Sequence, residues 1–196
     1  MSATAAPFGL TPVYHPSGLD RANMYTILPT YSSAIFKGDP VLLNANGTVN
    51  VGAAGTALLG VFAGCEYVDS TGKPTLSNFY PASQSVQSGS EIRCYVYDDP
   101  LIVYEIQSVG ALNSTLATAM AYIGDEADIT AYAAGSTSTG LSIVSLATGT
   151  MAGAASQKQF RIIGVGLSPD NEITDAFPIL RVTLAQSQFR AATTAV

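Results

Sequence analysis

The chain has 196 residues, of which 47% are hydrophobic and 11% are charged, and its net charge at pH 7 is −6. This length fits one domain with a substantial core, and the scattered Lys and Arg residues argue against a nucleic-acid partner. Soluble domains usually carry about 25% charged residues, so the surface either consists largely of uncharged polar and small side chains or is covered by another subunit. The composition leaves both alternatives open.

Residues 1–23 are predicted to form an extended N-terminal arm. Prolines at positions 7, 12 and 16 block a helix and restrict the residue before each of them. A disordered tail would have few large apolar side chains, yet several lie between these prolines. We therefore expect the arm to dock on its own domain, on a sister subunit or on a larger surface. Its candidate contact residues are Phe8, Leu10, Pro12, Val13 and Tyr14.

A first strand is predicted at residues 24–28. Residues 41–43 and 48–51 are predicted to pair as a hairpin, because the Asn-Gly turn between them readily takes the positive φ angles of a tight turn. The apolar run at residues 58–64 predicts a further strand that is fully buried. Together the three strand signals between residues 41 and 64 have the pattern of a small antiparallel barrel or sandwich.

The most regular alternation in the chain lies at Ile92–Tyr97 and predicts a half-buried strand. Residues 101–107 predict the next strand, and the Asp-Asp-Pro turn between the two predicts a hairpin. Tyr95 and Tyr97 share the outward face of this strand, so they are candidates for an inter-subunit face. Ordinary packing within a barrel is the alternative for both tyrosines. Residues 68–90 are expected to form a long loop or hairpin that reaches outward.

Later in the chain, residues 111–122 are the only helix candidate, because apolar side chains recur there every four residues, and a loop with a strand is the alternative. Residues 129–157 carry no charge and have the composition of loops, with one short strand candidate at 141–146. The last two strands are predicted at Phe160–Val165 and Ile179–Leu184.

These elements predict a mainly β fold. We expect an antiparallel β-barrel or sandwich, jelly-roll-like, with an extended N-terminal arm and at most one short helix. The β domain is expected at residues 24–184, with long loops or a small subdomain at 68–90 and 108–157. The polar tail at 185–196 is expected to be frayed.

The sequence offers few groups for catalysis or metal binding. His15 is the single histidine and lies among the prolines of the arm, which is a poor setting for a catalytic base. Asp98-Asp99 and the acidic turn at residues 124–128 place carboxylates side by side in turns rather than across a cleft. Neither run has the ligand spacing of a calcium loop. We therefore expect no catalytic residue, no metal and no cofactor.

Cys65 and Cys94 each lie in an apolar run, so we expect two buried, reduced thiols. A disulfide would require their strands to be neighbours in register, which the sequence leaves open. The N-terminus has neither the basic start nor the apolar centre of a signal peptide. No stretch of about 20 apolar residues predicts a membrane span.

Several segments match a known group of proteins in the same order along the chain. They are FGLTPV, GDPV with the hairpin after it, LLGVFAGCEYVDSTGKPTLSN, YVYDDPLIVYEIQ, IGDEADI, GSTSTGLS and RIIGVGLSPDNEITDAFPILRVTL. The series extends from Phe8 to about residue 184, and it resembles the capsid decoration (cement) proteins of tailed bacteriophages. None of the segments is catalytic.

This resemblance implies a non-enzymatic β-barrel protein with arms, which forms homotrimers on the outer surface of the virion and clamps neighbouring major capsid subunits. Its partners would be the major capsid protein and other copies of itself, with no nucleic acid and no membrane, and it would be made in the host cytoplasm. The alternative interpretation is a carbohydrate- or receptor-binding β module of a phage head or tail fibre, for which Phe79-Tyr80 is the only aromatic platform. A small hydrolase on a β scaffold is a third interpretation.

Overall fold

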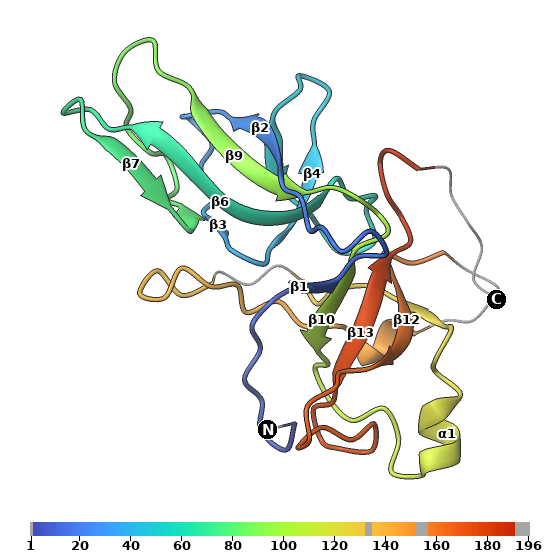
Figure 1. Cartoon of the computed structure of the whole chain (residues 1–196). Coiled ribbons are helices and arrows are strands. Elements are labelled where there is room, and N and C mark those ends of the chain that lie inside the picture. The colour runs from blue at the N-terminus through green and yellow to red at the C-terminus, as the bar shows by residue number, and fades with distance from the viewer. Residues whose placement is uncertain (1, 132–134, 152–156, 191–196) are drawn as a thin grey trace.

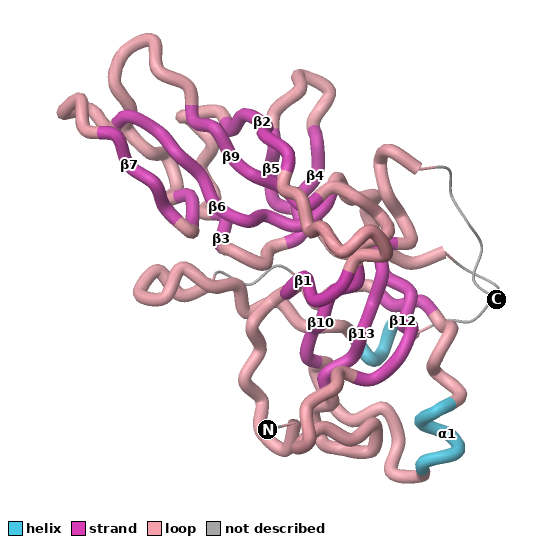
Figure 2. Tube along the Cα trace, viewed as in Figure 1, coloured by secondary structure: helices cyan, strands magenta, loops and turns pink. Residues whose placement is uncertain are grey.

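The structure is a computed structural model that describes residues 2–131, 135–151 and 157–190. It is mainly β, its strands pair antiparallel within their sheets, and the described residues contain one short α-helix, as predicted. Figures 1 and 2 show two lobes, each built around its own sheet, which meet near the middle of the view. We name them the six-strand lobe and the five-strand lobe.

The six-strand lobe contains a sheet in the order β2-β9-β6-β4-β5, with β7 paired to the far part of β6. A two-stranded sheet of β3 and β8 packs against β6. The strands are β2 (Asn23–Ile27), β3 (Ile35–Phe36), β4 (Pro40–Leu43), β5 (Val49–Val51), β6 (Gly60–Val68), β7 (Pro74–Ser77), β8 (Phe79–Tyr80) and β9 (Ile92–Tyr97).

The five-strand lobe contains a sheet in the order β1-β10-β13-β12-β11, and helix α1 lies at its far end in Figure 1. Long loops cover the inner face of this sheet. The elements are β1 (Thr11–Tyr14), β10 (Val103–Gln107), α1 (Leu116–Met120), β11 (Glu126–Ala127), the 3₁₀ turn η1 (Thr148–Thr150), β12 (Phe160–Val165) and β13 (Ile179–Leu184).

Each lobe has its own hydrophobic core. The core of the six-strand lobe consists of buried side chains that come almost entirely from strands, with Phe62 of β6, Tyr80 of β8 and Ile92 of β9 among the largest. The core of the five-strand lobe includes Tyr104 and Phe160 from strands, but also many buried side chains from loops. The alternation predicted for Ile92–Tyr97 is confirmed, since its inward residues are buried and its outward residues are not.

Within the described residues neither sheet closes into a barrel. The six-strand sheet curls until its two ends, β2 and β5, approach each other, and they make contact at one isolated bridge between Thr26 and Thr48. A continuous ladder between the two strands would be needed for closure. The fold is therefore a pair of curved antiparallel sheets rather than the closed barrel that was one of the two predicted forms.

The predicted hairpin between β9 and β10 is wrong. β9 lies between β2 and β6, whereas β10 lies between β1 and β13 in the other sheet. The carboxylate of Asp98, just after β9, accepts hydrogen bonds from the Asn23 amide at 2.8 Å and the Tyr25 hydroxyl at 2.5 Å. These bonds hold the end of β9 against β2, so the Asp-Asp-Pro turn leads the chain from one lobe into the other.

Three smaller expectations also differ from the structure. The helix covers Leu116–Met120 only, and residues 141–146 make isolated bridges instead of a strand while burying Val144 and Leu146 in the five-strand core. Residues 185–190 are not frayed, because the Gln188 side chain bonds the backbone N–H and C=O of Leu43 in the six-strand lobe. The remainder of the predicted tail, residues 191–196, lies outside the described residues.

Candidate interaction surfaces

The N-terminal segment, predicted to be an extended arm, is built into the five-strand lobe, which is one of the docking alternatives left open for it. Thr11–Tyr14 form β1, which pairs with β10 at the edge of the sheet, and an edge strand is a position where Pro12 is tolerated. Leu10 is only 1% exposed and belongs to the five-strand core. Leu10 therefore presents no surface to a partner, and among the predicted contacts it is corrected to a core residue.

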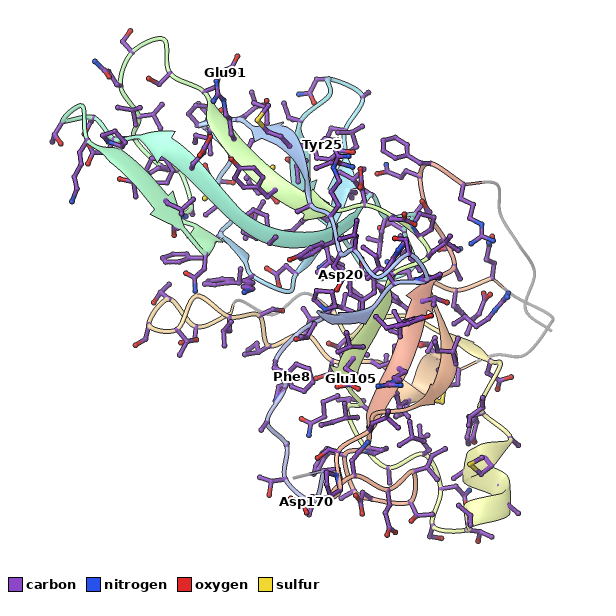
Figure 3. All side chains as sticks on the ribbon, viewed as in Figure 1. Phe8, Asp20, Tyr25, Glu91, Glu105 and Asp170 are labelled. Carbon is purple, nitrogen blue, oxygen red and sulfur yellow. The ribbon has the colours of Figure 1, made fainter. Side chains whose placement is uncertain are left out.

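Buried polar contacts fix the residues before β1. The Gln107 side chain accepts a hydrogen bond from the Ala6 N–H at 2.8 Å and donates one to the Thr4 carbonyl at 3.0 Å. The Ser2 carbonyl accepts the Phe177 N–H at 2.8 Å. The segment thus lies across the outer face of the five-strand sheet, where Figure 3 shows Phe8 beside β1.

Residues 8–12 also close the joint between the lobes. A small cavity of about 50 Å³ separates Phe8, Leu10 and Pro12 from Phe62 and Tyr97 of the six-strand lobe. Tyr97 is partly buried and packs against the five-strand core, so it faces this joint, which agrees with the alternative of packing within the molecule.

Gly9 makes the close approach at this joint. A Cβ on Gly9 would lie 2.5 Å from the Cβ of Ser142 and 2.7 Å from the Gly38 carbonyl oxygen, and its φ of +72° lies in the left-handed region. Only glycine meets both conditions without displacing the backbone. The N-terminal segment is therefore held against both lobes by its main chain as well as by Leu10.

Of the remaining predicted contacts, Val13 and Tyr14 are exposed, whereas Phe8 and Pro12 are partly buried at the joint. Tyr14 pairs with Val103, and His15 contacts Asp99, so the chain after β1 lies beside the chain before β10. Four exposed, large apolar side chains belong to β1, to the turn after it and to the turn before β10. We call the set the β1 patch, and it consists of Val13, Tyr14, Leu19 and Leu101.

His15 holds the turn behind the β1 patch. Its Nδ1 lies 2.6 Å from the Ser17 hydroxyl and its Nε2 lies 3.1 Å from the Asp99 carboxylate. The Ser17 N–H also donates to Nδ1 at 3.1 Å, which assigns the ring proton to Nε2. Ser17 is exposed, and neither this residue nor His15 lines the small cavity at the joint. These contacts show that His15 and Asp99 fix the conformation of the turn after β1.

The outer face of the six-strand lobe carries a second exposed surface. Leu76 of β7 lies opposite Glu66 of β6, which lies opposite Arg93 of β9, so the three side chains form one row across the sheet. The carboxylate of Glu66 is 3.5 Å from the guanidinium of Arg93. Tyr95 lies next to this row, and burial together with the Glu66 carboxylate raises the pKa of Tyr95.

An open groove of about 740 Å³ runs over this row. Its remaining walls come from the end of β6, the start of β7 and residues 89–91 before β9. Figure 3 shows Glu91 at the end of the lobe that lies away from the five-strand sheet. Sequence reasoning missed Glu66, Leu76, Glu91 and Arg93, although the outward alternation at Ile92–Tyr97 already placed Arg93 beside Tyr95.

The aromatic pair Phe79-Tyr80 does not form the exposed aromatic platform considered for it in the carbohydrate-binding alternative. Tyr80 is buried, and its hydroxyl donates to the Tyr31 carbonyl at 2.9 Å. Phe79 stacks on Phe36, with ring centroids 5.5 Å apart. Both rings therefore help to attach the β3–β8 pair to the six-strand core.

The two cysteines are buried and free, as predicted. Their strands are neighbours in register, with Cys65 of β6 directly opposite Cys94 of β9. Burial raises the pKa of each thiol to about 12. Cys65 donates a weak hydrogen bond to the Phe79 carbonyl, 3.4 Å away. The pair is thus a core contact of the six-strand lobe.

Across the ranges that the structure describes, no three His, Cys, Asp or Glu side chains come together as a metal site. In the same ranges, no helix has the length and apolar character needed to cross a membrane. Comparisons with protein-family models, with curated proteins and with solved structures found no match to the chain.

Proposed function

We propose that the chain is a non-enzymatic structural protein of a tailed-phage virion, which binds the outer surface of the capsid and clamps neighbouring major capsid subunits. Its partners are the major capsid protein and further copies of itself, in a homotrimer. It is made in the host cytoplasm and works as a decoration protein. The order of segments from Phe8 to about residue 184 supports this proposal together with the surface described above.

The β1 patch is the observation that carries the proposal. Its four side chains are all at least 37% exposed, and Leu19 reaches 73%. Burying one such side chain fully stabilises a complex by roughly 1.5–3 kcal/mol. Exposed apolar side chains on and beside an edge strand are costly to leave in water, and such residues are typical of a surface that another protein covers.

The structure also changes the way in which the N-terminal segment would bind a partner. Leu10 and the hydrogen bonds of Gln107 fix the segment in its own lobe, so Val13 and Tyr14 are presented on a rigid edge. A rigid surface loses less conformational entropy on binding than a free arm would. In a trimer, binding of one copy to the capsid would hold the other two copies close to their sites, so that their binding would follow readily.

The test uses capsids of the phage that encodes the chain, assembled without this protein. Copies bound per capsid are counted after addition of the wild-type chain, of the double variant Tyr14→Ser/Leu19→Ser, and of Leu116→Ser. Leu116 is the matched control, because it is 62% exposed but lies on α1, away from the β1 patch.

We expect full occupancy by the wild-type and Leu116→Ser chains. The double variant is expected to require at least a tenfold higher concentration for the same occupancy, at an unchanged melting temperature. Light scattering is expected to give a homotrimer. A wild-type chain that does not bind these capsids would contradict the proposed function, and a double variant that binds normally would contradict the role of the patch.

A further inference from the structure

The groove on the six-strand lobe has the size and chemistry of a ligand site. Its volume of about 740 Å³ lies in the range of about 300–1,000 Å³ that is usual for small-molecule sites. Its walls combine apolar groups from Val68, Pro74 and Leu76 with the ionic groups of Glu66, Glu91 and Arg93. It is therefore neither a purely apolar groove nor a single-sign charged cleft.

The charges of the groove argue against an anionic ligand. Arg93 is the single cationic residue of the lining, and its guanidinium is already paired with Glu66 at 3.5 Å. Glu91 adds a second carboxylate to the lining. A phosphate or a polyanion would approach two carboxylates and one neutralised cation, so its binding would be opposed.

The same groups suit a ligand that donates and accepts hydrogen bonds without a net charge. Carboxylates accept from neighbouring hydroxyl groups, while a guanidinium presents several N–H donors in a fixed fork. Leu76 is 79% exposed and, with Pro74, offers an apolar ledge for the C–H face of a ring. Pyranose rings combine these two features, namely adjacent hydroxyl groups on the rim and an apolar face.

We propose that this groove binds a neutral oligosaccharide, with Glu66, Arg93 and Glu91 bonding its hydroxyl groups and Leu76 packing against a ring face. The site is distinct from the β1 patch. It lies at the outer end of the six-strand lobe, where Figure 3 shows Glu91, whereas the patch belongs to β1 and the turn before β10 in the other lobe. A chain attached through the β1 patch would keep the groove open to solvent.

The experiment uses the isolated full chain, so its outcome does not depend on capsid binding. The chain is screened against an array of neutral and anionic oligosaccharides and against a Lys-rich peptide, and each binder is titrated by calorimetry. The variants are Arg93→Met and Leu76→Asp. The matched control is Arg181→Met, because Arg181 of β13 faces Glu105 of β10 at 3.2 Å in a cross-strand pair outside the groove.

We expect at least one neutral oligosaccharide to bind, with an affinity that falls at least tenfold in Arg93→Met and in Leu76→Asp. Arg181→Met should bind like the wild type, and all three variants should keep the wild-type melting temperature. The inference is overturned if no neutral oligosaccharide binds, if only the peptide or anionic glycans bind, or if the two groove variants bind as tightly as the control.

Discussion

The two lobes build their cores in different ways. In the six-strand lobe every residue of the buried cluster except Leu59 lies on a strand, and the sheet buries its own inward side chains. In the five-strand lobe half of the buried cluster comes from outside the strands, including Leu10, Ile129 and Ile173. Buried polar residues follow the same division, since of those described only Asp39 and Thr48 lie in the six-strand lobe.

The difference shows what fixes the long loops of the five-strand lobe. The Gln159 oxygen accepts the Ile129 N–H at 3.2 Å, and its amide donates to the Ala53 and Thr56 carbonyls of the loop between β5 and β6 at 2.8 and 2.9 Å. Asn171 bonds both backbone groups of Ile179. Loops without a regular ladder still need partners for buried peptide groups, and here buried amide side chains supply them. This lobe should therefore be sensitive to the loss of polar contacts.

The largest expected effect on stability tests this sensitivity at the ion pair between Glu126 of β11 and Arg161 of β12. Glu126 is fully buried, and its carboxylate accepts a bond from Arg161 at 2.8 Å. Arg161→Met would leave a buried carboxylate without its cation, at a cost of about 3–5 kcal/mol in the free energy of unfolding. Urea unfolding measures this loss.

The matched control for Arg161→Met is Arg181→Met. Arg181 pairs with Glu105 at 3.2 Å, but both side chains are partly exposed. Its loss should cost less than about 1 kcal/mol. Similar losses in the two variants would show that the buried pair has no special weight in the five-strand lobe.

The second expected effect concerns the N-terminal segment. Leu10→Ala removes a side chain that packs in the five-strand core, so we expect a loss of about 2–5 kcal/mol in the free energy of unfolding. Tyr14→Ser, in the exposed part of β1, should stay within about 0.5 kcal/mol of the wild type. Equal, small effects of both substitutions would mean that the segment is a loosely attached arm after all.

The contrast between the lobes also explains what could be predicted from the sequence. β9, β12 and β13 agree with the predicted bounds because period-two alternation reports a strand with one buried face. The partner of a strand is not encoded in that period. The Asp-Asp-Pro turn resembles a hairpin turn in sequence, and only the bonds of Asp98 to β2 show that it connects two sheets.

The candidate surfaces were predicted less completely, for a related reason. Val13 and Tyr14 were identified as apolar residues between prolines, but the same criterion selected Leu10, which is buried. The groove depends on Leu76, Glu66 and Arg93, which are adjacent only through the register of three strands. No local pattern in the sequence contains that register, so the groove could not be found before the pairing was known.

The third expected effect is a pH dependence at the joint between the lobes. Burial raises the pKa of Asp39 from 3.8 to about 6, although hydrogen bonds from Ser142 and from the Phe36 N–H act to lower it. A carboxyl with a raised pKa binds its proton more tightly in the folded state. Its contribution to stability is therefore complete below about pH 3.8 and is lost as the pH rises through about 6.

Asp39→Asn removes this titration. Relative to the wild type, the variant should gain up to ~3 kcal/mol in the free energy of unfolding between pH 3.5 and pH 7.5. The measurement is urea unfolding of both proteins at several pH values, and the difference between them cancels the titration of all other groups. A difference that is independent of pH would show that Asp39 is hydrated and that the joint is open to water.

The smallest expected effect concerns reactivity rather than stability, and it tests how dry the six-strand core is. Cys65 and Cys94 face each other across β6 and β9, both are buried, and burial raises the pKa of each thiol to about 12. At pH 8 only about 1 in 10,000 of such thiols is ionised, and the thiolate is the species that reacts. Labelling of the native chain by iodoacetamide should therefore be far slower than labelling in urea, where both thiols should react at the rate of a free cysteine. Because the two residues share one core, they should also become reactive together as urea is raised. Labelling of one cysteine before the other would mean that β6 and β9 separate locally, and an intact mass two hydrogens lighter would show a disulfide across the pair.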